Sequence, residues 1–83
     1  MKTALICIGE CKHKELITKV VKTPITEYII NAKDGKQLLS LVNELISNNY
    51  RVIVFDEIAP EELLEISLKY KDKAILIALS STK

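Results

Sequence analysis

Apolar runs alternate with amphipathic stretches along the whole chain. The strand-like runs span residues 4–8, 27–31, 51–55 and 74–79, and the first and third are continuously apolar. Such a run, closed by Gly9 in one case and followed by Asp56 in the other, is typical of a strand covered on both faces. We therefore predict four strands. The second is short and polar at both ends, so we expect it at an edge of the sheet.

Between these strands the apolar residues recur at helical spacing. In the first helix they fall three, four, seven and eight residues after His13. Thr23-Pro24 ends this helix, because a proline disfavours helical geometry in the residue before it. Asp34, with Gln37 three residues later, has the spacing of a capping box and starts the second helix. Asn48-Asn49 ends it.

The third helix begins at Pro60, which fits the first turn of a helix. Glu61 and Glu62 follow where the positive end of the helix dipole favours carboxylates, and lysines gather at the far end. The expected inner faces of the three helices are Leu16, Ile17, Val20 and Val21; Leu38, Leu41, Val42, Leu45 and Ile46; and Leu63, Leu64, Ile66 and Tyr70.

Strands and helices that alternate in this way form a parallel sheet through right-handed crossovers. We predict one α/β domain over residues 1–83, with a three-layer, flavodoxin-like fold. Its parallel sheet has four strands in the order 2-1-3-4, with three helices. The first helix then lies alone on one face of the sheet. The apolar surface left beside it is typical of an interface with another chain or with a second copy.

Composition narrows the classes of function. Twelve basic and eleven acidic residues leave a net charge of +1, and the lysines are scattered, so nucleic acid is not an expected partner. No run approaches the roughly twenty apolar residues of a spanning helix, which argues against direct membrane insertion. The first residues lack the apolar core of a signal peptide. We expect a cytoplasmic protein that reaches a membrane only through a complex.

Candidate site residues follow the predicted strands, because an open parallel sheet binds ligands beyond the carboxyl ends of its strands. They are Gly9, Glu10, Asp56, Glu57 and Ser80. We expect Glu10 and Asp56 to face each other across the switch point. Such a pair could hold Mg²⁺, or Asp56 could accept a phosphoryl group; the alternative is a pair of solvated loop carboxylates. No glycine-rich nucleotide loop occurs, and we expect no cofactor.

Cys7, Cys11 and His13 supply soft ligands within one loop. A structural zinc site requires four ligands, so we expect no metal, and we expect Cys7 to be a small buried apolar residue. A disulfide between the two cysteines is not expected in a reducing compartment. His13 starts an apolar stripe and has no nucleophile to serve, so we expect a boundary histidine rather than a catalytic base.

The order of motifs resembles the F subunit of V-type and archaeal A-type rotary ATPases. In that family the first strand ends in Gly-Asp, to which Ile8-Gly9-Glu10 is similar. A later strand ends in a Thr-Glu-x-Ala-like turn, to which residues 55–59 are similar, and the last strand ends near Ile-Pro-Ser, here residues 77–80. Lys14-Glu15-Leu16 stands where the family has Gly-Phe-Arg-Leu, and the family's C-terminal extension has no counterpart in this sequence.

The resemblance implies a non-catalytic component of the central stalk that couples or regulates rotation. Its expected partners are the coiled-coil D-type subunit and the catalytic head, or a second copy of the chain. The alternative is a receiver-like signalling domain with Asp56 as phosphoacceptor or Mg²⁺ ligand. A receiver needs an acidic pair after its first strand and a lysine after a fifth, and only Glu10 is present. On either interpretation we do not expect an enzyme.

Overall fold

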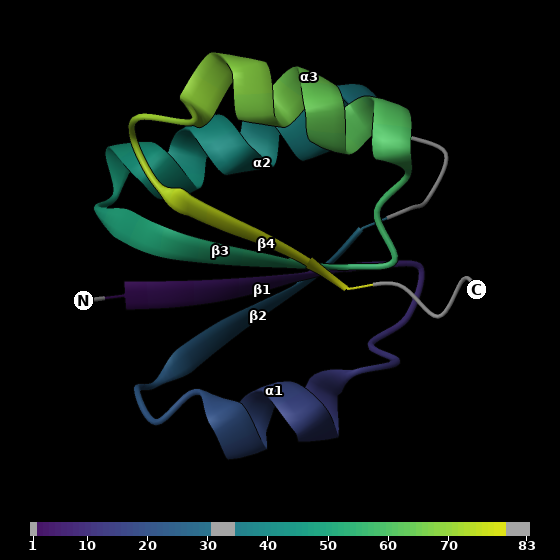
Figure 1. The fold of residues 1–83 in the computed structure, drawn as a ribbon, viewed down its shortest axis with the longest axis vertical. Coiled ribbons are helices and arrows are strands. Elements are labelled where there is room, and N and C mark those ends of the chain that lie inside the picture. Colours follow the sequence, from purple (N-terminus) through teal and green to yellow (C-terminus); the bar gives the residue numbers. More distant parts are fainter. Residues whose placement is uncertain (1, 31–34, 80–83) are drawn as a thin grey trace.

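Strands and helices alternate along the chain, and the helices lie on both faces of one parallel sheet (Figure 1). The computed structural model describes residues 2–30 and 35–79. The elements are β1 (Lys2–Ile8), α1 (Lys14–Val20), β2 (Ile25–Ile30), α2 (Gly35–Ser47), β3 (Tyr50–Asp56), α3 (Pro60–Tyr70) and β4 (Ile75–Leu79).

The sheet has the order β2-β1-β3-β4, and every neighbouring pair of strands is parallel. The prediction of a flavodoxin-like α/β fold with this order is therefore confirmed. β1 and β3, the two continuously apolar strands, are central, and the short β2 lies at an edge. β2 begins at Ile25, two residues before the predicted start.

Local sequence signals explain where the elements end. At the end of α1, Val21 has extended backbone geometry and donates its N–H to Ile17. α2 ends where Asn49 takes a φ of 67°, a left-handed conformation that Asn tolerates better than most residues. Pro60 stands at the start of α3 as predicted. The predicted cap at Asp34 lies outside the described residues.

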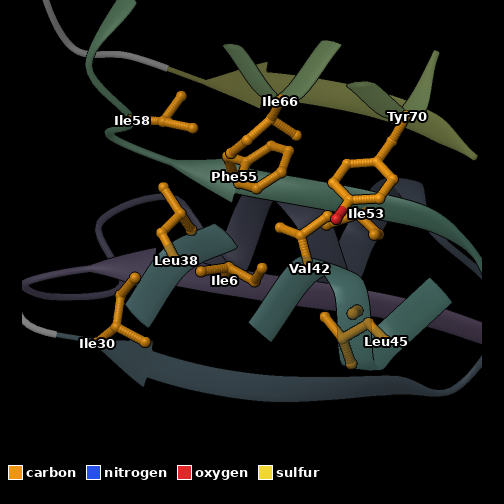
Figure 2. Packing of buried hydrophobic residues seen from close by; sticks show 11 residues of the cluster. Ile6, Ile30, Leu38, Val42, Leu45, Ile53, Phe55, Ile58, Ile66 and Tyr70 are labelled. Carbon is orange, nitrogen blue, oxygen red and sulfur yellow. The ribbon is translucent and has the colours of Figure 1, made fainter. Parts of the chain in front are cut away.

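The main core lies between the sheet and the two helices α2 and α3 (Figure 2). Phe55 and Ile53 of β3 and Ile6 of β1 are completely buried there. Val42, from the predicted stripe of α2, is part of this core, and so is Tyr70, the last residue of α3. The buried members of this cluster are Ala4, Ile6, Ile30, Leu38, Val42, Leu45, Ile53, Phe55, Ile58, Ile66 and Tyr70.

A smaller cluster lies on the opposite face, beneath α1 alone. Its buried members are Leu5, Cys7, Ile17 and Val54. Within the described residues, α1 is the one helix on this face, as the predicted strand order requires. With seven residues it is also the shortest helix described. It therefore covers the central strands and leaves the β4 side of the face open.

One prediction about α3 is wrong. Leu64 was expected on the inner face of this helix, but 61% of its surface is exposed. Ile66 and Tyr70 fix the buried side of α3, and Leu64 lies two positions before Ile66, which is about 200° around a helix. Of two adjacent leucines, only Leu63 therefore turns toward the sheet.

Candidate functional site

The carboxyl ends of the strands bring four residues into one row on the α1 face. Cys7 of β1 is paired in register with Ile29 of β2 and with Asp56 of β3, and Asp56 is paired with Leu79 of β4. Paired residues of parallel strands point to the same face of a sheet. A buried cysteine and a buried carboxylate therefore lie side by side at the switch point of the fold, where ligands bind in such sheets.

Asp56 is completely buried, and both of its carboxylate oxygens have partners on His13. The backbone N–H of His13 donates to Oδ2 at 2.7 Å, and the imidazole Nδ1 lies 2.7 Å from Oδ1. Because an ionised carboxylate can only accept, Nδ1 then carries the hydrogen. The His13 side chain keeps 23% of its surface exposed. Asp56 thus fixes the residue from which α1 begins, and the other ring nitrogen of His13 is not used in this contact.

Cys7 and Cys11 form a disulfide, so the expectation of two unpaired thiols is wrong. The two Cα atoms are 5.0 Å apart. Cys7 is buried as predicted, but its sulfur is bonded to Cys11, which is partly exposed. The thiols were expected to stay unpaired because the expected compartment is reducing. The local geometry brings the two residues together, because the chain turns back immediately after β1.

Backbone hydrogen bonds hold the turn between the two cysteines. Gly9 has a φ of 88°, a conformation that a glycine adopts at little cost. Its N–H donates to the carbonyl of Ile30 at 2.9 Å, and Lys12 N–H donates to the carbonyl of Glu10 at 3.2 Å. Together with the bond from His13 to Asp56, these contacts fix both sides of the disulfide loop.

A surface ion pair adjoins Cys11. Glu27 of β2 binds the Lys14 ammonium through Oε2 at 2.8 Å. Its other oxygen, Oε1, lies 3.4 Å from Cys11 Sγ. A disulfide sulfur has no hydrogen to donate, so this is a contact in the oxidised protein. In a reduced protein the Cys11 thiol could donate to the same oxygen.

Glu57 adds a third polar side chain to this end of the sheet. Ligand atoms of His13, Asp56 and Glu57 lie within 4.8 Å of one another. Glu57 has a φ of 67°, and its N–H donates to the carbonyl of Leu79 at 2.8 Å. Because Asp56 already binds His13 with both oxygens, we do not assign a metal to these residues.

Glu10 and Asp56, which were expected to face each other, lie in different environments. Glu10 is exposed in the loop after β1, and it is not part of the cluster of potential metal ligands that the described residues form. Asp56 is buried and fully engaged by His13, which disfavours it as a phosphoacceptor. Ser80 lies outside the described residues. Sequence reasoning placed Asp56 at this edge but missed His13 as its partner.

An apolar groove runs beside the strand ends on the α1 face. It has a volume of about 170 Å³, and only apolar side chains line it. Leu16 and Val20 of α1 were expected on the inner face of that helix, but they are 52% and 69% exposed, and Ile77 of β4 is 40% exposed. The complete lining is Leu16, Ile17, Val20, Val21, Val54, Ile77 and Leu79.

The comparisons with known proteins do not assign this chain to a family. Protein-family models, curated proteins and solved structures give no match. Among the described helices, none is long and apolar enough to cross a membrane.

Proposed function

We propose that this chain is a non-catalytic protein-binding module that receives an amphipathic helix of another subunit in the groove between α1 and β4. The observation that carries the proposal is the apolar lining of this groove, with Leu16, Val20 and Ile77 turned toward solvent. Burying such side chains contributes on the order of 25 cal/mol per Å² of apolar surface, which favours a covering partner.

The opposite face of the sheet indicates what kind of element fits. There two helices lie side by side over the sheet, whereas α1 has no helical neighbour among the described residues (Figure 1). A helix next to α1 would cover β4, whose sequence from Ile75 to Leu79 contains only apolar residues. An edge strand without charges is normally covered or paired.

The charged residues around α1 indicate which side chains the partner helix should carry beside its apolar stripe. The segment around α1 carries Lys12, Lys19 and Lys22 against the single acidic Glu15, while Lys14 is bound to Glu27. On a helical wheel, Lys19 lies next to Leu16 on the outward side of α1. The best complement is therefore a helix with an apolar stripe and acidic residues beside it.

The resemblance to the F subunit supplies a specific candidate. The coiled-coil D-type stalk subunit is the expected partner, with the catalytic head as a second contact. The role would be coupling or regulation of rotation in a V- or A-type complex, and the membrane would be reached only through that complex. Geometry supports the receiver-like alternative less well, because Asp56 is buried against His13.

A binding experiment with two matched variants tests this proposal. The intact chain is mixed with the purified D-type subunit and, separately, with head subunits. Leu16→Glu, in the groove, should abolish binding, whereas Leu64→Glu should preserve it, because Leu64 is similarly exposed on α3 outside the groove. Circular dichroism checks that both variants are folded.

Two outcomes would reject the proposal. A folded chain that binds neither stalk nor head subunits excludes the rotary ATPase role. A dimer in light scattering that Leu16→Glu dissociates would identify a second copy of the chain, rather than a partner helix, as the occupant of the groove.

A further inference from the structure

The disulfide lies at a functional position of the fold. Cys7 stands at the carboxyl end of β1 between β2 and β3, at the switch point of the parallel sheet. The Cys7–Cys11 bond closes a very short loop, and short loops give disulfides a small role in holding a fold together. Location and loop length both point away from a purely structural bond.

The two sulfurs differ in access. Cys7 is completely buried in the cluster beneath α1, while Cys11 is partly exposed at the surface next to Glu27. Of the two cysteines, Cys11 is therefore the one that an incoming thiolate can reach from solvent. Cys7 Sγ is then the leaving sulfur, and it remains inside the protein.

The surrounding contacts do not depend on the disulfide. β1 is paired on both sides, so Cys7 is held by the sheet. The Gly9 N–H bonded to Ile30 and the His13 N–H bonded to Asp56 fix the loop on either side of Cys11. Because none of these bonds involves a sulfur atom, we expect them to persist when the disulfide opens and to keep the two thiols within reach of each other.

We propose that Cys7–Cys11 is a reversible thiol–disulfide exchange centre that reacts with an external thiol. The thiol loses its proton to solvent, its sulfur bonds to Cys11, and the Cys7–Cys11 bond breaks. The electron pair of that bond stays on Cys7, which takes up a proton. A second thiol attacks the external sulfur of the mixed disulfide and releases Cys11, which is also protonated. The protein gains two electrons and two protons, and two thiols become one disulfide.

Glu27 offers a hydrogen-bond acceptor to Cys11 in the reduced protein. Its Oε1, 3.4 Å from Cys11 Sγ, can accept the hydrogen of the Cys11 thiol. A hydrogen bond to the neutral thiol stabilises that form over the thiolate and over the disulfide. Neither cysteine lines the helix-docking groove, although Cys7 packs against Ile17 and Val54, which do.

The first test is the redox equilibrium of the intact chain with reduced and oxidised glutathione. The fraction of disulfide is measured by alkylation and mass spectrometry, and folding by circular dichroism. We expect a smooth transition within ordinary glutathione ratios while the chain stays folded. A bond that persists under both excess reduced glutathione and a thioredoxin-type dithiol protein, or that opens only together with unfolding, would show a structural disulfide and overturn the proposal.

The second test compares the two single-cysteine variants in oxidised glutathione. Cys11 in Cys7→Ser should form a mixed disulfide at least about tenfold faster than Cys7 in Cys11→Ser, because reactivity follows access. Equal rates would contradict the assigned roles. If either variant is unfolded, the wild-type equilibrium still decides the proposal.

Two further measurements identify the thiol and the part played by Glu27. Reduction by glutathione alone indicates a small thiol, and reduction only by a thioredoxin-type dithiol protein indicates a protein partner; reduction by neither overturns the proposal. Glu27→Ala removes the acceptor and should shift the glutathione equilibrium about fivefold toward the disulfide, whereas Glu10→Ala, in the loop that contains Cys11, should not. An unchanged equilibrium in Glu27→Ala would exclude its role.

Discussion

On one face of the sheet two helices bury a continuous core, whereas α1, the one helix that the described residues place on the other face, is short and leaves the β4 side open. The first face holds Phe55, Ile53 and Val42 without exposed surface. The second leaves Val20 and Ile77 open to solvent beside a groove lined only by apolar side chains. The face covered by α2 and α3 therefore holds most of the buried core, whereas the α1 face carries the candidate site residues and the proposed interface.

Matched leucine substitutions should show the largest difference between the faces. Leu45→Ala, in α2, removes a buried side chain and should lower the free energy of unfolding by about 2–5 kcal/mol. Leu16→Ala, in α1, should lower it by less than about 1 kcal/mol, because half of the Leu16 surface is already exposed. Urea denaturation of both variants measures the difference. Equal losses would mean that the α1 face supports the fold as strongly as the α2/α3 face.

Asp56 is a completely buried acidic residue on the open face. Asp56→Ala leaves the backbone N–H and the ring nitrogen of His13 without their acceptor, and should cost about 1–3 kcal/mol of unfolding free energy. Asp72→Ala, at an exposed position, is the control and should change stability by less than about 0.5 kcal/mol. If both variants unfold at the same urea concentration, the contact between Asp56 and His13 has no structural importance.

The disulfide should stabilise the open face only modestly. The loop-closure entropy of so short a loop corresponds to about 2 kcal/mol of unfolding free energy. The reduced chain should therefore unfold at lower urea than the oxidised chain while keeping its native circular dichroism spectrum. Complete unfolding on reduction would show that the α1 face depends on this bond.

The smallest effect concerns Tyr28, on the better covered face. Its hydrogen bond to Tyr50 and its partial burial raise the pKa of Tyr28 to about 12. Since the folded pKa exceeds the usual value of 10, this contribution to stability is complete below about pH 10 and is lost as the pH rises through 12. Absorbance at 295 nm should show one tyrosine titrating near pH 12, and Tyr50→Phe should move it downward. A titration without that component would contradict the contact.

The fold could be predicted because its signals are local and repeated. The continuous apolar runs of β1 and β3 and the stripe of α2 indicate buried elements without knowledge of their partners. Strand alternation then leaves few topologies. The prediction for Leu64 was wrong because the sequence alone does not show which of two adjacent leucines in a helix faces the sheet.

The site was less predictable because its contacts join distant residues. Asp56 was placed at the correct edge by its strand, but its partner His13 lies 43 positions away, at the start of α1. Glu10 seemed the natural neighbour on sequence grounds, yet the turn at Gly9 leaves it exposed. That same turn brings Cys11 to Cys7, and the spacing of the two cysteines gave no sign of it.

The all-parallel pairing of the sheet has a kinetic consequence. None of the described strands is joined to its neighbour by a tight hairpin, because parallel strands need a crossover connection. Each pairing must therefore wait until the intervening segment has crossed over the sheet. β3, which pairs with both β1 and β4, is the strand through which these distant segments become one sheet. The chain should therefore fold more slowly than a helical bundle of its size. Until β3 is paired, its apolar residues are exposed to other unfolded chains, and refolding yield should fall as protein concentration rises.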